Sequence, residues 1–91
     1  MGFEITAGSV VFSRAGRDKG RCFAVLTVEG DYALIADGSL RKAAKPKRKK
    51  LMHLRATPRK VPLENPVQDF RLRAALAEHS QKSAGETNAQ G

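Results

Sequence analysis

The chain has very little of several residue types on which common kinds of protein function depend. It contains a single cysteine, Cys22, so no disulfide can form within it. A structural zinc site needs about four ligands, and Cys22, His53 and His79 are neither numerous enough nor suitably spaced for one. There is no tryptophan and only one tyrosine. We therefore expect no metal and no cofactor.

Long apolar runs are also missing. No run approaches the roughly 20 residues that span a bilayer, and the first residues, MGFEITAGSVVF, lack the basic start and long apolar core of a signal peptide. We expect a cytoplasmic, soluble protein without a membrane partner. The length of 91 residues suits one small domain with a tail.

Nothing in the chain suggests catalysis. No Ser–His–Asp or Cys–His arrangement is indicated, because Cys22 lies in an apolar segment and is expected to be buried. The carboxylates are scattered, and we expect Asp18 to steady its own loop through hydrogen bonds to Lys19 or Gly20. We therefore predict that the protein is not an enzyme.

Positive charge, by contrast, is abundant. The 17 Lys and Arg residues outnumber the 9 Asp and Glu residues, which gives a formal net charge of +8. These charges cluster rather than scatter, and a clustered excess favours a polyanionic partner because bound counterions are released from phosphates. A basic protein without a dedicated partner is the alternative.

Short β-strand patterns fill residues 9–54. The segments SVVFS, CFAVLTVE and YALIAD are rich in β-branched and apolar residues and are bounded by turn signals. SLRK after Asp37–Gly38 predicts a fourth strand, and KLMHLR predicts a fifth. Both alternating sets of CFAVLTVE are apolar, so the inward face cannot be chosen from the pattern. Five short strands with tight turns predict an all-β fold, a small barrel or rolled sheet, over residues 1–57.

The pattern changes after Thr57. Three prolines in TPRKVPLENP predict an extended linker over residues 58–65. Asn65 as N-cap, Pro66 at the first position and Gln68 in a capping box then predict a short helix over residues 66–81. Its apolar face could dock on the barrel or on a partner. Residues 82–91 are polar and predict a disordered tail.

The stretch FSRAGRDKGRCF places Gly16 and Gly20 around a charged cluster between two strands. It is not a phosphate-binding P-loop, because its glycines are separated by three residues and Arg21 follows. Glycine permits a positive φ and close approach of another backbone, so we expect a tight loop from which Arg17, Lys19 and Arg21 project.

Together, SVVFSRAGRDKGRCFAVLTV and YALIADGSLRKAAKPKRKKLMHL resemble the KOW motif, with Gly20 as its central glycine. Over residues 6–57 the chain is similar to bacterial KOW-domain RNA-binding proteins related to ribosomal protein L-fourteen-e. The resemblance implies a five-stranded SH3-like barrel that binds ribosomal RNA or a related ribonucleoprotein. It does not cover the predicted helix.

The segment RKAAKPKRKK has seven cations in ten residues. Without a ligand, such a loop should repel itself and be mobile, whereas phosphates would relieve the repulsion. A solvated loop and a nuclear-localisation signal in PKRKK are alternative interpretations. Because a second basic loop lies one strand away, we favour phosphate contact from both. The predicted RNA-binding residues are Arg14, Arg17, Lys19, Arg21, Arg41, Lys42, Lys45, Lys47, Arg48, Lys49, Lys50 and His53.

Phe12 and Phe23 lie in apolar runs and are expected in the core, while Tyr32 could be exposed and stack on a base. Because single-strand binders display several aromatic residues, we favour recognition of folded RNA. His53 suits an RNA contact and a barrel position equally. The sequence thus predicts a protein that is a monomer when free and binds ribosomal RNA, with ribosomal proteins as further partners. A protein-interaction KOW module of the transcription or translation machinery is the alternative.

Overall fold

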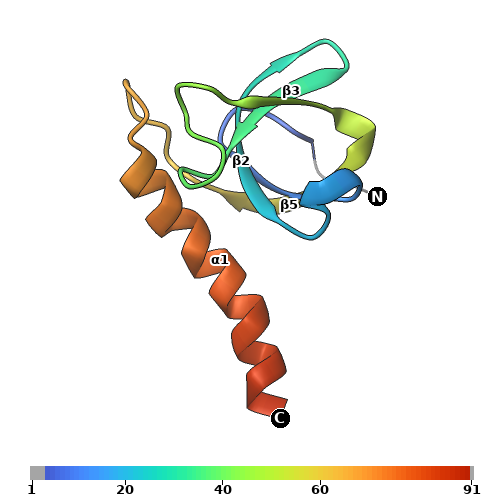
Figure 1. The fold of residues 1–91 in the computed structure, drawn as a ribbon, viewed down its shortest axis with the longest axis vertical. Coiled ribbons are helices and arrows are strands. Elements are labelled where there is room, and N and C mark those ends of the chain that lie inside the picture. The colour runs from blue at the N-terminus through green and yellow to red at the C-terminus, as the bar shows by residue number, and fades with distance from the viewer. Residues whose placement is uncertain (1–3, 91) are drawn as a thin grey trace.

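The computed structural model describes residues 4–90, and side chains up to residue 79, so residues 1–3 of the predicted barrel and Gly91 of the predicted tail lie outside the described part (Figure 1). Within that part the fold is mostly β. The elements, in chain order, are β1 (Ser9–Ser13), η1 (Gly16–Asp18), β2 (Cys22–Glu29), β3 (Tyr32–Ala36), β4 (Lys47–Lys50), η2 (Leu51–His53), β5 (Leu54–Lys60) and α1 (Asp69–Gln90), where η denotes a 3₁₀ helix.

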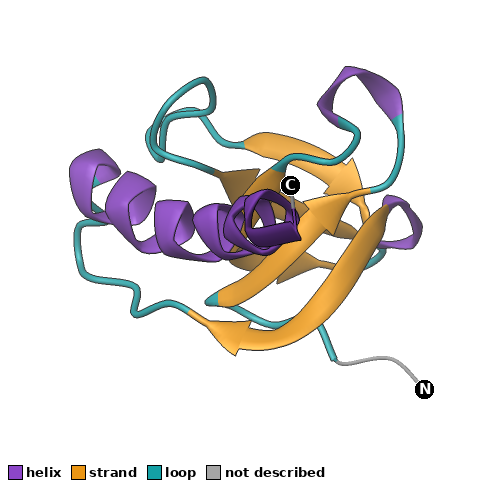
Figure 2. Ribbon diagram, turned by 90° about the horizontal axis from the view of Figure 1, so that it is seen from below, coloured by secondary structure: helices purple, strands orange, loops and turns teal. Residues whose placement is uncertain are grey.

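The five strands form one antiparallel sheet in the order β4-β3-β2-β1-β5. β4 and β5 are its edges, and the sheet is strongly curved, with α1 lying across one side (Figures 1 and 2). The predictions of strands at β1, β2 and β3 are confirmed. No helix among the described residues is both long and apolar enough to cross a membrane.

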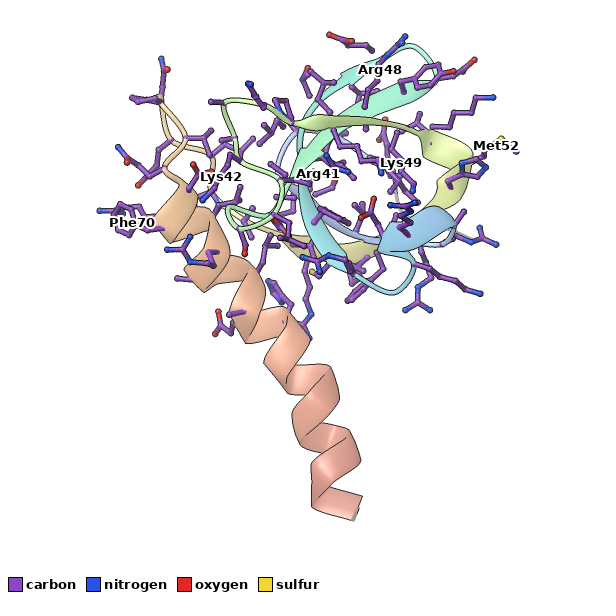
Figure 3. The ribbon with its side chains drawn as sticks, in the orientation of Figure 1. Arg41, Lys42, Arg48, Lys49, Met52 and Phe70 are labelled. Atoms are coloured by element: carbon purple, nitrogen blue, oxygen red, sulfur yellow. The ribbon has the colours of Figure 1, made fainter. Side chains whose placement is uncertain are left out.

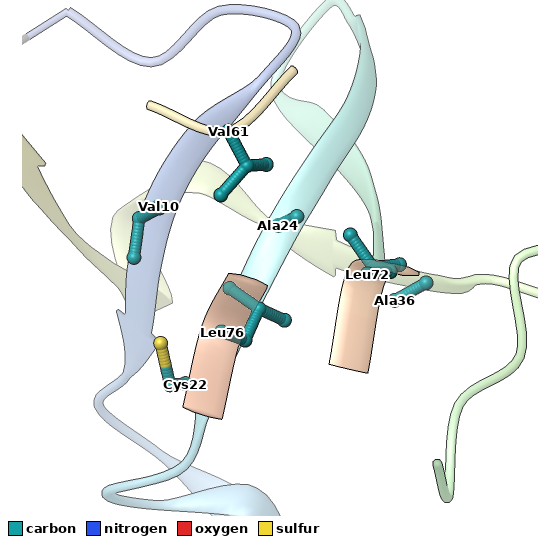
Figure 4. Packing of buried hydrophobic residues seen from close by; sticks show 7 residues of the cluster. All are labelled: Val10, Cys22, Ala24, Ala36, Val61, Leu72 and Leu76. Carbon is teal, nitrogen blue, oxygen red and sulfur yellow. The ribbon is translucent and has the colours of Figure 1, made fainter. Parts of the chain in front are cut away.

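Strand alternation divides the apolar residues of β1 and β2 between two clusters. Val11, Phe23 and Val25 pack on one face with Ile35 and Leu54. The opposite face has a second cluster, which consists of Val10, Cys22, Ala24, Ala36, Val61, Leu72 and Leu76 (Figure 4). Both alternating sets of β2 are therefore apolar because both faces of the sheet are covered.

Helix α1 covers the second face with Leu72 and Leu76, which are 3% and 4% exposed. The docking position that the sequence left open is thus on the chain's own sheet. Phe70 and Ala74, on another side of the helix, are exposed. Phe70 points away from the sheet (Figure 3).

The prediction of a fourth strand at SLRK is wrong. Asp37 Oδ1 accepts hydrogen bonds from the backbone N of Ser39 and of Arg41, both at 2.9 Å, and these bonds close a turn that prevents extension along β3. The free side of β3 is instead paired by β4, which lies in the lysine-rich segment that we expected to be a mobile loop.

The predicted fifth strand and the predicted linker both lie further along the chain than expected. Leu51–His53 form η2, and β5 continues through Thr57 and Pro58 to Lys60, so the linker predicted over residues 58–65 begins later. Proline is tolerated in β5 because it is an edge strand, and the register with β1 shifts between Ser9 and Val11.

The helix begins at Asp69, not at Pro66, and it is longer than predicted, with 22 residues. Asn65 does not cap it; the carbonyl of Gln68 accepts the first helical bond, from Leu72 N at 2.9 Å. The helix extends to Gln90, so it includes residues 82–90, for which we predicted disorder.

Gly38 allows the helix to reach the sheet. Its φ is +77°, and a Cβ there would lie 2.2 Å from the carbonyl oxygen of Asp69. Arg73 Nη1 donates to the Gly38 carbonyl at 2.7 Å, and Ala43 N donates to Asp69 Oδ1 at 2.7 Å. The close backbone approach that we expected of the glycine loop thus occurs here, whereas Gly20, with φ +87°, has open space where its Cβ would lie.

Gly38 and Gly20 therefore form a matched pair for a stability test. Gly20→Ala introduces only the cost of a positive φ, which we expect to lower the free energy of unfolding by about 1–2 kcal/mol. Gly38→Ala adds a clash with the helix backbone, which should cost about 1–3 kcal/mol more. Urea denaturation followed by circular dichroism measures both. Equal losses would contradict the role of Gly38 in helix docking.

Candidate nucleic-acid interface

A single carboxylate joins the glycine loop to the lysine-rich strand. Asp18, at the end of η1, accepts a hydrogen bond from Lys47 Nζ at 2.6 Å, and its Oδ2 lies 3.9 Å from Lys49 Nζ. Lys49 Nζ also donates to the carbonyl of Ala15 at 2.8 Å. The two basic segments that the sequence placed one strand apart are therefore in direct contact, through side chains of β4.

These contacts explain why the lysine-rich segment is ordered where we expected mobility. In a strand, alternate side chains point to opposite faces, so Lys47 and Lys49 turn toward η1 while Arg48 turns away. Figure 3 shows Arg48 and Lys49 on opposite sides of β4. Lys49 is only 8% exposed, which is tolerable because Asp18 and a carbonyl receive its ammonium group.

The function that we expected of Asp18 is also corrected. The described bonds of its carboxylate go to β4 and not to Lys19 or Gly20, and within its own loop its backbone carbonyl accepts from Arg21 N at 2.8 Å. The hydrogen bond from Lys47 lowers the pKa of Asp18 below 3.8, against the opposing effect of burial, and the charges of Lys47, Lys49 and Arg41 lower it further. Arg41, from the loop after β3, therefore belongs electrostatically to the same cluster.

A second carboxylate fixes Arg21, the last cation of the glycine loop. Arg21 Nη2 lies 2.8 Å from Oδ2 of the buried Asp37. Burial alone would raise the pKa of Asp37, but hydrogen bonds from the backbone N of Arg41 and Ser39 and from Arg21 outweigh it and lower the pKa below 3.8. Asp37 thus anchors both the turn after β3 and the end of the glycine loop.

The predicted RNA-binding residues therefore fall into two groups. Lys47, Lys49 and Arg21 are engaged by internal carboxylates and have mainly structural contacts. The exposed cations of the set, which can reach a ligand, are Arg14, Arg17, Lys19, Lys42, Lys45, Arg48 and Lys50; Arg41 is half-buried.

The structure also bears on the burial that we expected of two phenylalanines, of Cys22 and of His53. Phe23 and Cys22 are buried as predicted, and Phe12 is half-buried against the helix-covered cluster. His53 is half-buried in η2, and its carbonyl accepts a bond from Arg14 N at 2.8 Å, so the structure supports neither of its two interpretations over the other.

Two side-chain pairs of the site were not predicted from the sequence. The Arg48 guanidinium lies 4.0 Å from the centroid of the Tyr32 ring, and Asp37 pairs with Arg21. The signal for the first was the alternation within KRKK, which would have placed Arg48 and Tyr32 on one face had the segment been assigned as a strand. The second could not be found, because its partners are brought together by the sheet and not by spacing.

The charge density is highest in these segments. Eleven of the 17 Lys and Arg residues fall within residues 14–21 and 41–50, where Asp18 is the only carboxylate. Within the described part of the chain, no three His, Cys, Asp or Glu side chains gather to hold a metal ion. Comparison with family models and with curated proteins finds no match for the chain. The cationic surface is therefore the feature of the molecule that bears on function.

The lowered pKa of Asp18 predicts a pH-dependent stability. Its charged form stabilises the fold above pH 3.8, and that contribution is lost as the pH falls through the lower folded-state pKa. We expect Asp18→Asn to lower the free energy of unfolding at neutral pH by about 1–3 kcal/mol, because Lys47 and Lys49 lose a charged acceptor. The difference from the parent chain should shrink below pH 3.8.

Urea denaturation at neutral pH and at a pH below 3.8 measures this effect, with Glu29→Gln as the control. Glu29 is exposed at the end of β2, so its substitution should change stability by no more than about 0.5 kcal/mol. An Asp18→Asn deficit that stays constant as the pH falls would show that the loss comes from packing and not from the ionised carboxylate.

Proposed function

We propose that this chain is a non-catalytic RNA-binding protein with a KOW-type, SH3-like barrel, which binds structured ribosomal RNA on the ribosome in the cytoplasm. The observation that carries the proposal is the contact between Asp18 and Lys47, at 2.6 Å. It makes the glycine loop and the lysine-rich strand one continuous surface. The resemblance of residues 6–57 to KOW-domain proteins supports the same function.

The surface can bind phosphates because it has more positive charges than the carboxylate within it neutralises. Asp18 neutralises one charge among Arg41, Lys47 and Lys49, so the cluster keeps a positive potential. Arg17 and Lys19 are exposed on the same loop as Asp18 and add to it. Condensed counterions that these cations displace from RNA would supply most of the binding free energy.

The ordered strand changes the mechanism that the sequence suggested. A mobile lysine loop would lose conformational entropy when it binds, at about 1–2 kcal/mol for each residue fixed. In β4 that cost is met on folding, because Lys47–Lys50 already pair with β3. The backbone positions of the two exposed cations, Arg48 and Lys50, are therefore fixed, which favours a partner whose phosphates are also fixed, such as a folded RNA.

A protein-interaction module is the second candidate, and specific exposed residues favour it. Leu40 is 70% exposed in the loop before β4, and Phe70 is 57% exposed on α1. The buried face of α1 is not available to a partner, since Leu72 and Leu76 pack in the chain's own core. Such binding would depend on apolar contact and would therefore respond weakly to salt.

The salt dependence of binding tests the proposed function. If about six phosphates are neutralised, the affinity for purified ribosomes or for a structured ribosomal RNA fragment should fall with a log–log slope near −4 to −5. Removing two contacting charges with Arg17→Gln and Lys19→Gln should weaken binding and reduce the slope by about two. Filter binding or fluorescence anisotropy over a salt series measures both quantities.

A matched double variant separates a located site from general attraction. Arg59→Gln and Lys60→Gln also remove two exposed cations, but Lys60 pairs with Ser9, at the opposite end of β1 from the glycine loop. This control should bind nearly as well as the parent chain. Equal losses in the two double variants, or an affinity that does not change with salt, would overturn the proposal.

A further inference from the structure

The face of β4 that points away from Asp18 has a composition of its own. Arg48 lies over the Tyr32 ring at 4.0 Å from its centroid, and Lys50 is the register partner of Tyr32 across the β3–β4 ladder. A shallow hollow beside them is lined by Asp31, Tyr32, Lys50, Leu51 and Met52. We call Tyr32, Arg48, Lys50 and Met52 the stacking surface.

Two features of this surface are unusual on an otherwise polar edge. The guanidinium of Arg48 is planar and rests on an aromatic ring, which fixes its orientation while Arg48 itself remains exposed. Met52 is 70% exposed at the hollow, although a side chain of that size would be more stable in contact with apolar atoms. The Tyr32 ring links the two features, because it carries the Arg48 guanidinium and lines the hollow together with Met52.

We propose that the stacking surface binds an unpaired base of RNA, an inference that rests on the proposed function. Arginine planes and aromatic rings are the groups on which unstacked bases settle in RNA recognition. The base would lie on the free face of the Arg48 guanidinium, beside Met52, and Lys50 would meet a neighbouring phosphate.

The charges of the hollow favour this occupant and orient it. Arg48 and Lys50 attract the RNA backbone, while Asp31, at the β2–β3 turn, repels phosphate and can accept a hydrogen bond from the amino group of a base. The base edge is therefore directed to Asp31, with the phosphates on the Lys50 side. The two surfaces meet along the edge of the sheet, because Arg48 and Lys50 alternate along the edge strand β4 with Lys47 and Lys49, which face Asp18.

The test compares an RNA stem closed by an unpaired loop with the same stem as a blunt duplex. A fluorescent aminopurine base in the loop reports stacking. The parent chain should bind the hairpin at least about fivefold more tightly than the duplex, because stacking of one base contributes that much or more. Binding should also change the aminopurine fluorescence.

Arg48→Lys is the decisive variant, because it keeps the charge and removes the plane. It should lose the preference for the hairpin and the fluorescence change, whereas its affinity for the duplex should fall by a much smaller factor, because the charge that meets phosphates is kept. Lys50→Gln should instead weaken binding to both RNAs by similar factors. Thermal unfolding checks that each variant is folded.

The outcomes separate this inference from the proposed function. Equal affinity of the parent chain for hairpin and duplex, or a hairpin preference that survives in Arg48→Lys, overturns the stacking site and leaves phosphate binding intact. Failure of the parent chain to bind either RNA overturns the proposed function, and the stacking site with it.

Discussion

The interaction on which the rest depends is the one between Asp18 and the lysines of β4. A segment of four consecutive cations has no intrinsic reason to form a strand, since its charges repel one another. Strand alternation sends only Lys47 and Lys49 toward η1, where Asp18 and the Ala15 carbonyl receive them. One carboxylate thereby orders the strand, closes the glycine loop against it and holds Arg48 on the opposite face.

The helix compensates for the small size of the sheet. A curved sheet of about fifty residues encloses little apolar volume, and a core of that size is only marginally stabilising. Leu72 and Leu76 bury the face formed by Val10 and Ala24, so the domain has two apolar clusters instead of one. Gly38 allows this because its missing side chain leaves room for the Asp69 carbonyl.

Sequence patterns predicted the parts of the fold that depend on local preference. β1, β2 and β3 follow β-branched and apolar runs between turn residues, and the burial of Phe23 follows from its run. The failures have a common cause. SLRK has the composition of a strand, but Asp37 captures the backbone N of Ser39 and Arg41, and KRKK has the composition of a loop, but Asp18 compensates its charge. Each outcome depends on a carboxylate that hydrophobic periodicity does not report: Asp37 bonds its own turn, and Asp18 meets lysines far along the chain.

Because β4 lies at the edge of the sheet, its charges bear both on protection of that edge and on the proposed contact with RNA. An edge strand exposes unpaired backbone groups that can recruit another strand, and lysines on such an edge prevent that association. In β4 the same cations are fixed by folding on both faces, with Lys47 and Lys49 toward the glycine loop and Arg48 and Lys50 toward Tyr32. A folded RNA that reached this edge would meet cations at fixed spacing and a stacking plane, without requiring the strand to reorganise. Protection of the edge and the proposed binding of a polyanion are therefore compatible, because both require the exposed positive charges that Arg48 and Lys50 present.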